Sequence, residues 1–69
     1  NVKRAEAQFR QVVLDYPLSQ KVPGAWLKLA KIYISQHKED KARSALKAIT
    51  AHHPESGVAP IAMEMLKGL

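Results

Sequence analysis

The sequence predicts an all-α fold in which antiparallel helix pairs stack side by side as a short superhelix of about four helices. Two observations predict this fold. Apolar residues recur at intervals of three and four in four segments, which is the spacing of one helix face. Two connectors, residues 17–23 and 54–60, each begin and end with a proline and separate these segments.

The first helix is expected over residues 1–16. Ala5, Phe9 and Tyr16 belong to its apolar face. Pro17 is expected to end this helix, because proline disfavours helical geometry in the residue that precedes it.

The second helix is expected to begin at Pro23, since a proline fits the first turn of a helix, where its missing N–H costs nothing. The segment that follows is apolar on most sides, from Trp26 through Tyr33, so neighbouring helices must cover it on two flanks. The remaining helices are expected over residues 40–53 and 60–69.

An internal repeat underlies this order of helices. Pro17 and Pro54 are 37 residues apart, and the same shift aligns further helix breakers and small residues. The aligned pairs are Ala5 with Ala42, Ser19 with Ser56, Pro23 with Pro60, Ala25 with Ala62, and Leu29 with Leu66. The chain then divides into the second half of one unit (1–16), a full unit (17–53) and the first half of a third (54–69).

Trp26, Leu29, Ala30 and Tyr33 have the spacing W-x-x-L-G-x-x-Y, which is that of the first helix of a tetratricopeptide repeat (TPR). The sequence resembles this family over essentially its whole length. The positions that carry the resemblance are Ala5, Phe9, Pro17, Trp26, Leu29, Ala30, Tyr33, Ala42, Leu46 and Pro54. The resemblance implies helices B, A, B and A in this order, a right-handed superhelix, and a protein–protein interaction or scaffolding function.

The expected packing follows from side-chain size. Ala25, Ala30 and Ala42 are small enough to let neighbouring helices approach closely. The larger residues expected between the helices are Trp26, Leu29, Tyr33, Leu46 and Ile49.

Three features depart from the family pattern. Ala30 replaces a glycine, and His37 stands where the family has a turn glycine, although histidine enters left-handed geometry more readily than most residues. The period is 37 rather than 34 residues, with the extra residues in the connector before Pro23. This longer connector resembles TPR-like segments of bacterial cell-envelope proteins such as YbgF (CpoB) and the outer-membrane assembly lipoproteins, which implies a periplasmic or envelope location.

Composition limits the classes of function. The 69 residues contain no cysteine, which excludes disulfides and thiolate metal sites. Hydrophobic residues make up 46 % and charged residues 25 %, which is ordinary for a globular domain. The net charge of +5 raises the odds of an acidic or anionic partner, but the basic residues are scattered along the chain, which favours a solvated, lysine-rich helical surface.

No catalytic, cofactor or metal site is expected. The sequence has neither a G-x-S-x-G motif nor a glycine-rich phosphate loop. Glu39 and Asp40 open a helix, where acidic residues favour the dipole. His52 and His53 are adjacent and diverge by about 100° on a helix, so they do not form a ligand pair. We therefore expect no enzyme activity.

The candidate site is a groove lined by the A helices, as the resemblance implies. Its expected residues are Leu27, Lys31, Ile34, Ile61 and Glu64. An apolar strip with one lysine suits an amphipathic helix or extended peptide that carries an acidic residue. In the alternative interpretation, Leu27 and Ile34 pack against a neighbouring helix. Leu27 also stands where the carboxylate-clamp subtype has a lysine, so capture of chaperone C-termini is not expected.

Two other functions fit the sequence. A basic helical domain that binds nucleic acid or another anionic surface would use a stripe on the outer faces of the B helices. That stripe would consist of Lys3, Arg10, Arg43 and Lys47. Self-association is the other possibility, because the last helix offers an apolar surface to a second copy or a further repeat. Its residues are Met63, Met65, Leu66 and Leu69.

Overall fold

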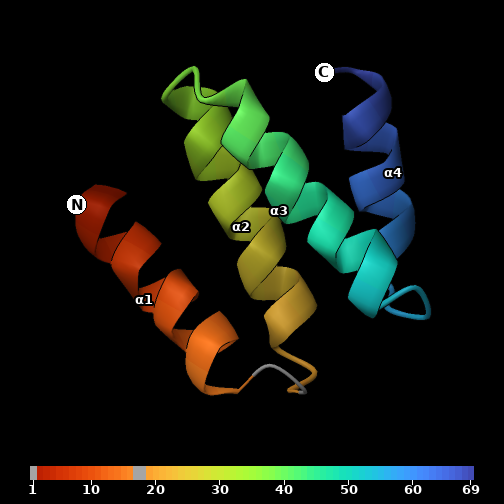
Figure 1. Cartoon of the computed structure of the whole chain (residues 1–69), viewed down its shortest axis with the longest axis horizontal. Coiled ribbons are helices and arrows are strands. Elements are labelled where there is room, and N and C mark those ends of the chain that lie inside the picture. The colour runs from red at the N-terminus through yellow and green to blue at the C-terminus, as the bar shows by residue number, and fades with distance from the viewer. Residues whose placement is uncertain (1, 17–18) are drawn as a thin grey trace.

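The computed structural model describes residues 2–16 and 19–69, without the side chain of Val2, and this part of the chain forms four α-helices. They are α1 (Val2–Asp15), α2 (Val22–Ser35), α3 (Glu39–His52) and α4 (Ala59–Lys67). Each helix packs antiparallel against the next along the chain, so that α2 lies between α1 and α3 (Figure 1). The predicted all-α fold of packed helix pairs is confirmed.

Both proline-bearing helix starts lie close to the predicted positions. Pro23 and Pro60 occupy the first turn of α2 and of α4, and each helix begins one residue before its proline. The N–H groups of the first helical turn have no acceptor within the helix, so a proline, which lacks an N–H, costs no hydrogen bond at these positions. Pro17 lies outside the described residues, and the preceding helix ends at Asp15.

The two long connectors are closed by corresponding main-chain hydrogen bonds. From donor N–H to acceptor oxygen, the bonds of the first connector are Tyr16 to Val12 (2.9 Å), Ser19 to Tyr16 (3.0 Å), Val22 to Ser19 (3.1 Å) and Ala25 to Lys21 (3.0 Å). Those of the second are His53 to Ile49 (2.8 Å), Ser56 to His53 (3.1 Å), Ala59 to Ser56 (3.1 Å) and Ala62 to Val58 (2.9 Å). Each donor and acceptor of the second set stands 37 residues after its counterpart in the first.

A serine side chain supports each connector in the same way. The Ser19 hydroxyl oxygen accepts a hydrogen bond from the N–H of Lys21 at 3.1 Å, and that of Ser56 accepts one from the N–H of Val58 at 3.2 Å. These bonds satisfy main-chain donors just before the next helix, where no helical partner is available. Ser19 and Ser56 therefore serve as local braces.

The core is apolar and is formed mainly where α2, α3 and α4 meet. Its fully buried side chains include Leu29, Ala30, Ala42, Leu46, Ile49 and Ala62. Ala25 and Tyr33 are also buried, as predicted. Trp26 is only half-buried, although it packs against both clusters into which the buried core residues divide. One core cluster consists of Ala30, Ala45, Leu46, Ile49, Ala59 and Ala62, and the other of Leu29, Tyr33 and Ala42.

His37 adopts the left-handed conformation, with φ of 60°, in the turn between α2 and α3. The N–H of Lys38 donates to the carbonyl of Tyr33 at 2.8 Å, and the N–H of His37 donates to that of Ile34 at 3.0 Å. This pair of bonds is the Schellman motif, which usually has glycine at the left-handed position. The left-handed turn that the sequence allowed at His37 is therefore present.

We expect His37→Gly to raise the free energy of unfolding by up to about 1 kcal/mol, because glycine lacks the Cβ that disfavours left-handed geometry. His37→Val is expected to lower it by roughly 1–2 kcal/mol, since a β-branched residue tolerates this geometry least. Urea denaturation measures both. Lys47→Gly, at an exposed position inside α3, is the control and should destabilise by about 1 kcal/mol. A loss of stability in His37→Gly equal to that of the control would contradict the role assigned to the turn.

We expect Ala42→Leu to lower the free energy of unfolding by roughly 1–3 kcal/mol, because a larger side chain has no room where α3 meets α2. Ala42 is 0 % exposed. Ala51→Leu, at an exposed position of the same helix, makes the same change in helix propensity and should cost less than about 0.5 kcal/mol. Thermal unfolding followed by circular dichroism compares the pair, and equal costs would argue against close packing at Ala42.

Candidate functional site

The predicted groove residues come from two helices. Leu27, Lys31 and Ile34 lie on α2, and Ile61 and Glu64 lie on α4. The helix α3 packs against both α2 and α4, so the two sets are held on one rigid framework.

These five residues differ in how deeply they are buried. Leu27 and Ile34 are half-buried, and each packs against a core cluster. Lys31 is exposed, and Ile61 is 47 % exposed. The exposed Glu64 carboxylate lies 3.8 Å from the Lys67 ammonium on its own helix. Part of the apolar surface of Leu27 and Ile34 on α2 is thus already buried against the core. That the groove is a binding site stays a prediction.

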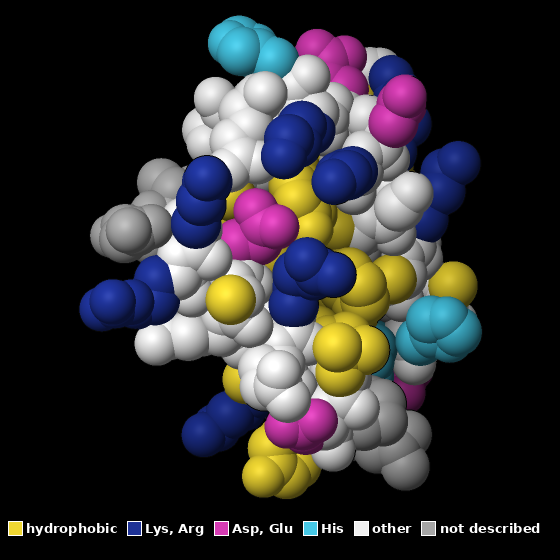
Figure 2. All heavy atoms as spheres, turned by 60° about the vertical axis from the view of Figure 1, so that its left-hand side comes forward, with side chains coloured by type: hydrophobic (Ala, Val, Ile, Leu, Met, Phe, Trp, Pro, Cys, Tyr) yellow, Lys and Arg dark blue, Asp and Glu magenta, His cyan; other side chains and the backbone are white. Residues whose placement is uncertain are grey.

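A pocket that the sequence did not reveal lies between α1, α2 and α3. We call it the α1–α3 pocket, and it encloses about 300 Å³. Its lining residues are Arg10, Val13, Leu14, Trp26, Leu29, Tyr33 and Lys41. Figure 2 turns the side where α1 lies toward the viewer and shows hydrophobic side chains across this face, with Lys and Arg side chains on both sides of them.

A second apolar recess of about 360 Å³ borders α1 and α2. Its lining residues are Phe9, Val12, Lys21, Gly24, Ala25 and Lys28. The Lys28 ammonium lies 5.5 Å from the centroid of the Phe9 ring, within range of a cation–π contact. Part of the apolar face of α1 is therefore open beside this lysine.

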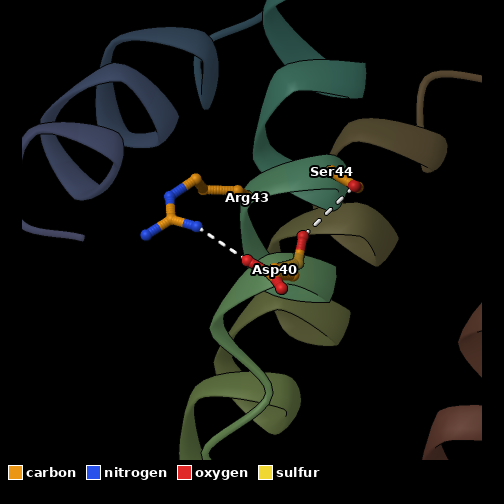
Figure 3. A network of polar contacts seen from close by, with 3 residues as sticks. All are labelled: Asp40, Arg43 and Ser44. Carbon is orange, nitrogen blue, oxygen red and sulfur yellow. Dashed lines mark hydrogen bonds and ion pairs between the residues drawn. The ribbon is translucent and has the colours of Figure 1, made fainter.

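Two arginines of the predicted basic stripe have acidic neighbours on their own helices. Arg43 donates to the Asp40 carboxylate at 3.0 Å, and the Ser44 hydroxyl donates to the main-chain oxygen of Asp40 at 3.2 Å (Figure 3). The Arg10 guanidinium lies 3.8 Å from the Glu6 carboxylate. At least one partner of each pair is well exposed, so the pairs add little stability, but their carboxylates offset the positive charge available to a phosphate backbone.

Neither a metal-binding cluster nor a membrane span is seen in the described part of the chain. Within residues 2–16 and 19–69, no three His, Asp or Glu side chains gather where they would hold a metal ion. None of the helices in the same ranges has the length and apolar character needed to cross a bilayer.

Residues 24–56 match the family model of a tetratricopeptide repeat. This range begins in the first turn of α2, contains the whole of α3 and ends in the connector that follows, so it covers one helix pair. No match to the chain was found among curated proteins or among solved structures. The fold is therefore all-α and TPR-like, with one repeat identified at residues 24–56.

Proposed function

We propose that the chain is a protein–protein interaction module of the TPR type that serves as part of a scaffold. The observation that carries this proposal is the repeat match over residues 24–56, which coincides with a packed helix pair. Its characteristic positions Leu29, Ala42 and Leu46 are all fully buried. TPR helix pairs provide rigid surfaces for other proteins, and such surfaces bind through apolar burial assisted by charge.

The proposed partner surface is the groove formed by Leu27, Lys31, Ile34, Ile61 and Glu64. The exposed ammonium of Lys31 and the exposed side chain of Ile61 suit a segment with both acidic and apolar residues. The net charge of +5 speeds encounter with such a segment.

We further propose a repeat of 37 residues, with units at 1–16, 17–53 and 54–69. The shared hydrogen bonds of the two connectors support it, because every one recurs after 37 residues. The resemblance of this longer connector to those of YbgF (CpoB) and of outer-membrane assembly lipoproteins supports a role in a bacterial envelope or assembly protein.

A further helix is proposed to cover α1. Ala5, Phe9 and Val12 are half-buried, whereas the residues 37 positions later are fully buried under α2 and α4. Those later residues are Ala42, Leu46 and Ile49. The difference supports stacking of a neighbouring repeat, or of a second copy, on α1. Met63, 55 % exposed on α4, offers a second apolar contact at the opposite end of the helix array.

To test the groove, we expect the double variant Lys31→Glu with Ile61→Asp to weaken peptide binding by roughly tenfold or more. The probe is a fluorescein-labelled amphipathic peptide with leucines at helical spacing and glutamates beside them, measured by fluorescence anisotropy. Both substituted side chains are exposed or largely so, and the fold should survive. Lys47→Glu with Ala51→Asp, both at exposed positions on α3, is the charge-matched control. Equal binding by the double variant and the control would rule out the groove.

To test self-association, we measure the weight-average sedimentation coefficient by sedimentation velocity. We expect it to rise as the protein concentration increases from the micromolar to the millimolar range. Ala5→Arg should suppress the rise, because it places a charge on the half-buried face of α1. Circular dichroism verifies that the variant stays folded. A purely monomeric profile at all concentrations would exclude stacking of copies of this chain.

A further inference from the structure

We propose that the α1–α3 pocket is a second binding site, which takes one large apolar side chain from an acidic peptide segment. The site is separate from the groove, because it shares no residue with it. It therefore does not depend on the proposed groove function.

The pocket is built from side chains that the fold already holds in place. Leu29 is fully buried and Tyr33 is 8 % exposed, so the base of the pocket belongs to the core. Val13 and Trp26 are half-buried beside them. Leu14, a residue that is 71 % exposed, extends the apolar lining of the pocket out to its edge.

The arrangement of the helices gives the pocket its walls. Both α1 and α3 pack against α2, and the pocket is lined by residues of all three helices. A volume of about 300 Å³ lies at the lower limit for ligand pockets, which suits one large side chain better than a cofactor.

Charge at the rim selects the kind of peptide. Arg10 on α1 and Lys41 on α3 flank the apolar surface from opposite helices. The Lys41 ammonium lies 5.8 Å from the centroid of the Tyr33 ring, which places a positive charge beside the pocket. The flanking cations complement aspartates or glutamates on either side of an inserted leucine or phenylalanine.

The acidic groups near the rim do not cancel this preference. Glu6 lies 3.8 Å from Arg10 in a long contact, and the side chain of Arg10 stays 61 % exposed. Asp40, next to Lys41 in sequence, is already hydrogen-bonded by Arg43 at 3.0 Å. An incoming carboxylate can therefore be bound by Arg10 and Lys41 at the mouth of the pocket.

Trp26 provides a direct readout, because it is the single tryptophan of the chain and it lines the pocket. The probe is the capped peptide Glu-Asp-Phe-Asp-Glu, titrated while tryptophan emission is followed. We expect a shift in emission on binding. The same peptide with glycine in place of phenylalanine, and one with lysines in place of the acidic residues, should each bind at least about tenfold more weakly.

Two variants locate the binding. Leu14→Asp should weaken the phenylalanine peptide roughly tenfold by adding a charge to the apolar edge, and Lys41→Glu should weaken it about fivefold or more. Each has a control with the same change of charge, Ala51→Asp for the first and Lys47→Glu for the second, both at exposed positions of α3 outside the pocket. The controls should bind as tightly as the parent chain.

The groove variant Lys31→Glu with Ile61→Asp should leave the Trp26 response unchanged, which separates failure of the groove from failure of the pocket. The proposal would be overturned if none of the peptides changed the tryptophan emission. Equal binding of the glycine peptide or of an oligonucleotide would overturn it too, because attraction to the cations alone would then explain the result. Loss of the response in Ala51→Asp to the same extent as in Leu14→Asp would also overturn it.

Discussion

The close approach of α2 and α3 is the interaction on which the rest of the structure depends. Ala30 and Ala42 are fully buried where the two helices meet, and their methyl groups let the backbones come near each other. Leu29, Leu46 and Ile49, which are also fully buried, can then fill the space on either side. This pair fixes the position of the other two helices, because α1 packs on α2 and α4 packs on α3.

A stack of this kind buries its middle better than its ends. The described residues contain no buried polar or charged side chain, so the core specifies its geometry by shape and by its connectors. The braces at Ser19 and Ser56 set how each helix enters the stack. Apolar area remains exposed on α1 and on α4, the two helices that pack mainly against one neighbour each.

Local features of the chain were predictable, whereas the pocket was not. The apolar periodicity gave the helices, Pro23 and Pro60 gave the helix starts to within one residue, and the left-handed turn was expected at His37. These depend on backbone preferences of a few neighbouring residues. The half-burial of Trp26 and the exposure of Leu14 depend instead on the distance between α1 and α3, which no local pattern encodes.

The lysines link the basic charge of the chain to its incomplete packing. At each of the two apolar recesses that border α1, an ammonium lies over an aromatic ring: Lys28 over Phe9 at 5.5 Å and Lys41 over Tyr33 at 5.8 Å. A lysine at such a place covers apolar surface with its stem while its charge stays in water. Both side chains are exposed, so a partner can displace the stem and keep the charge as a contact. The same two lysines therefore cover apolar surface in water and supply the positive charge on which the proposal of an acidic partner rests.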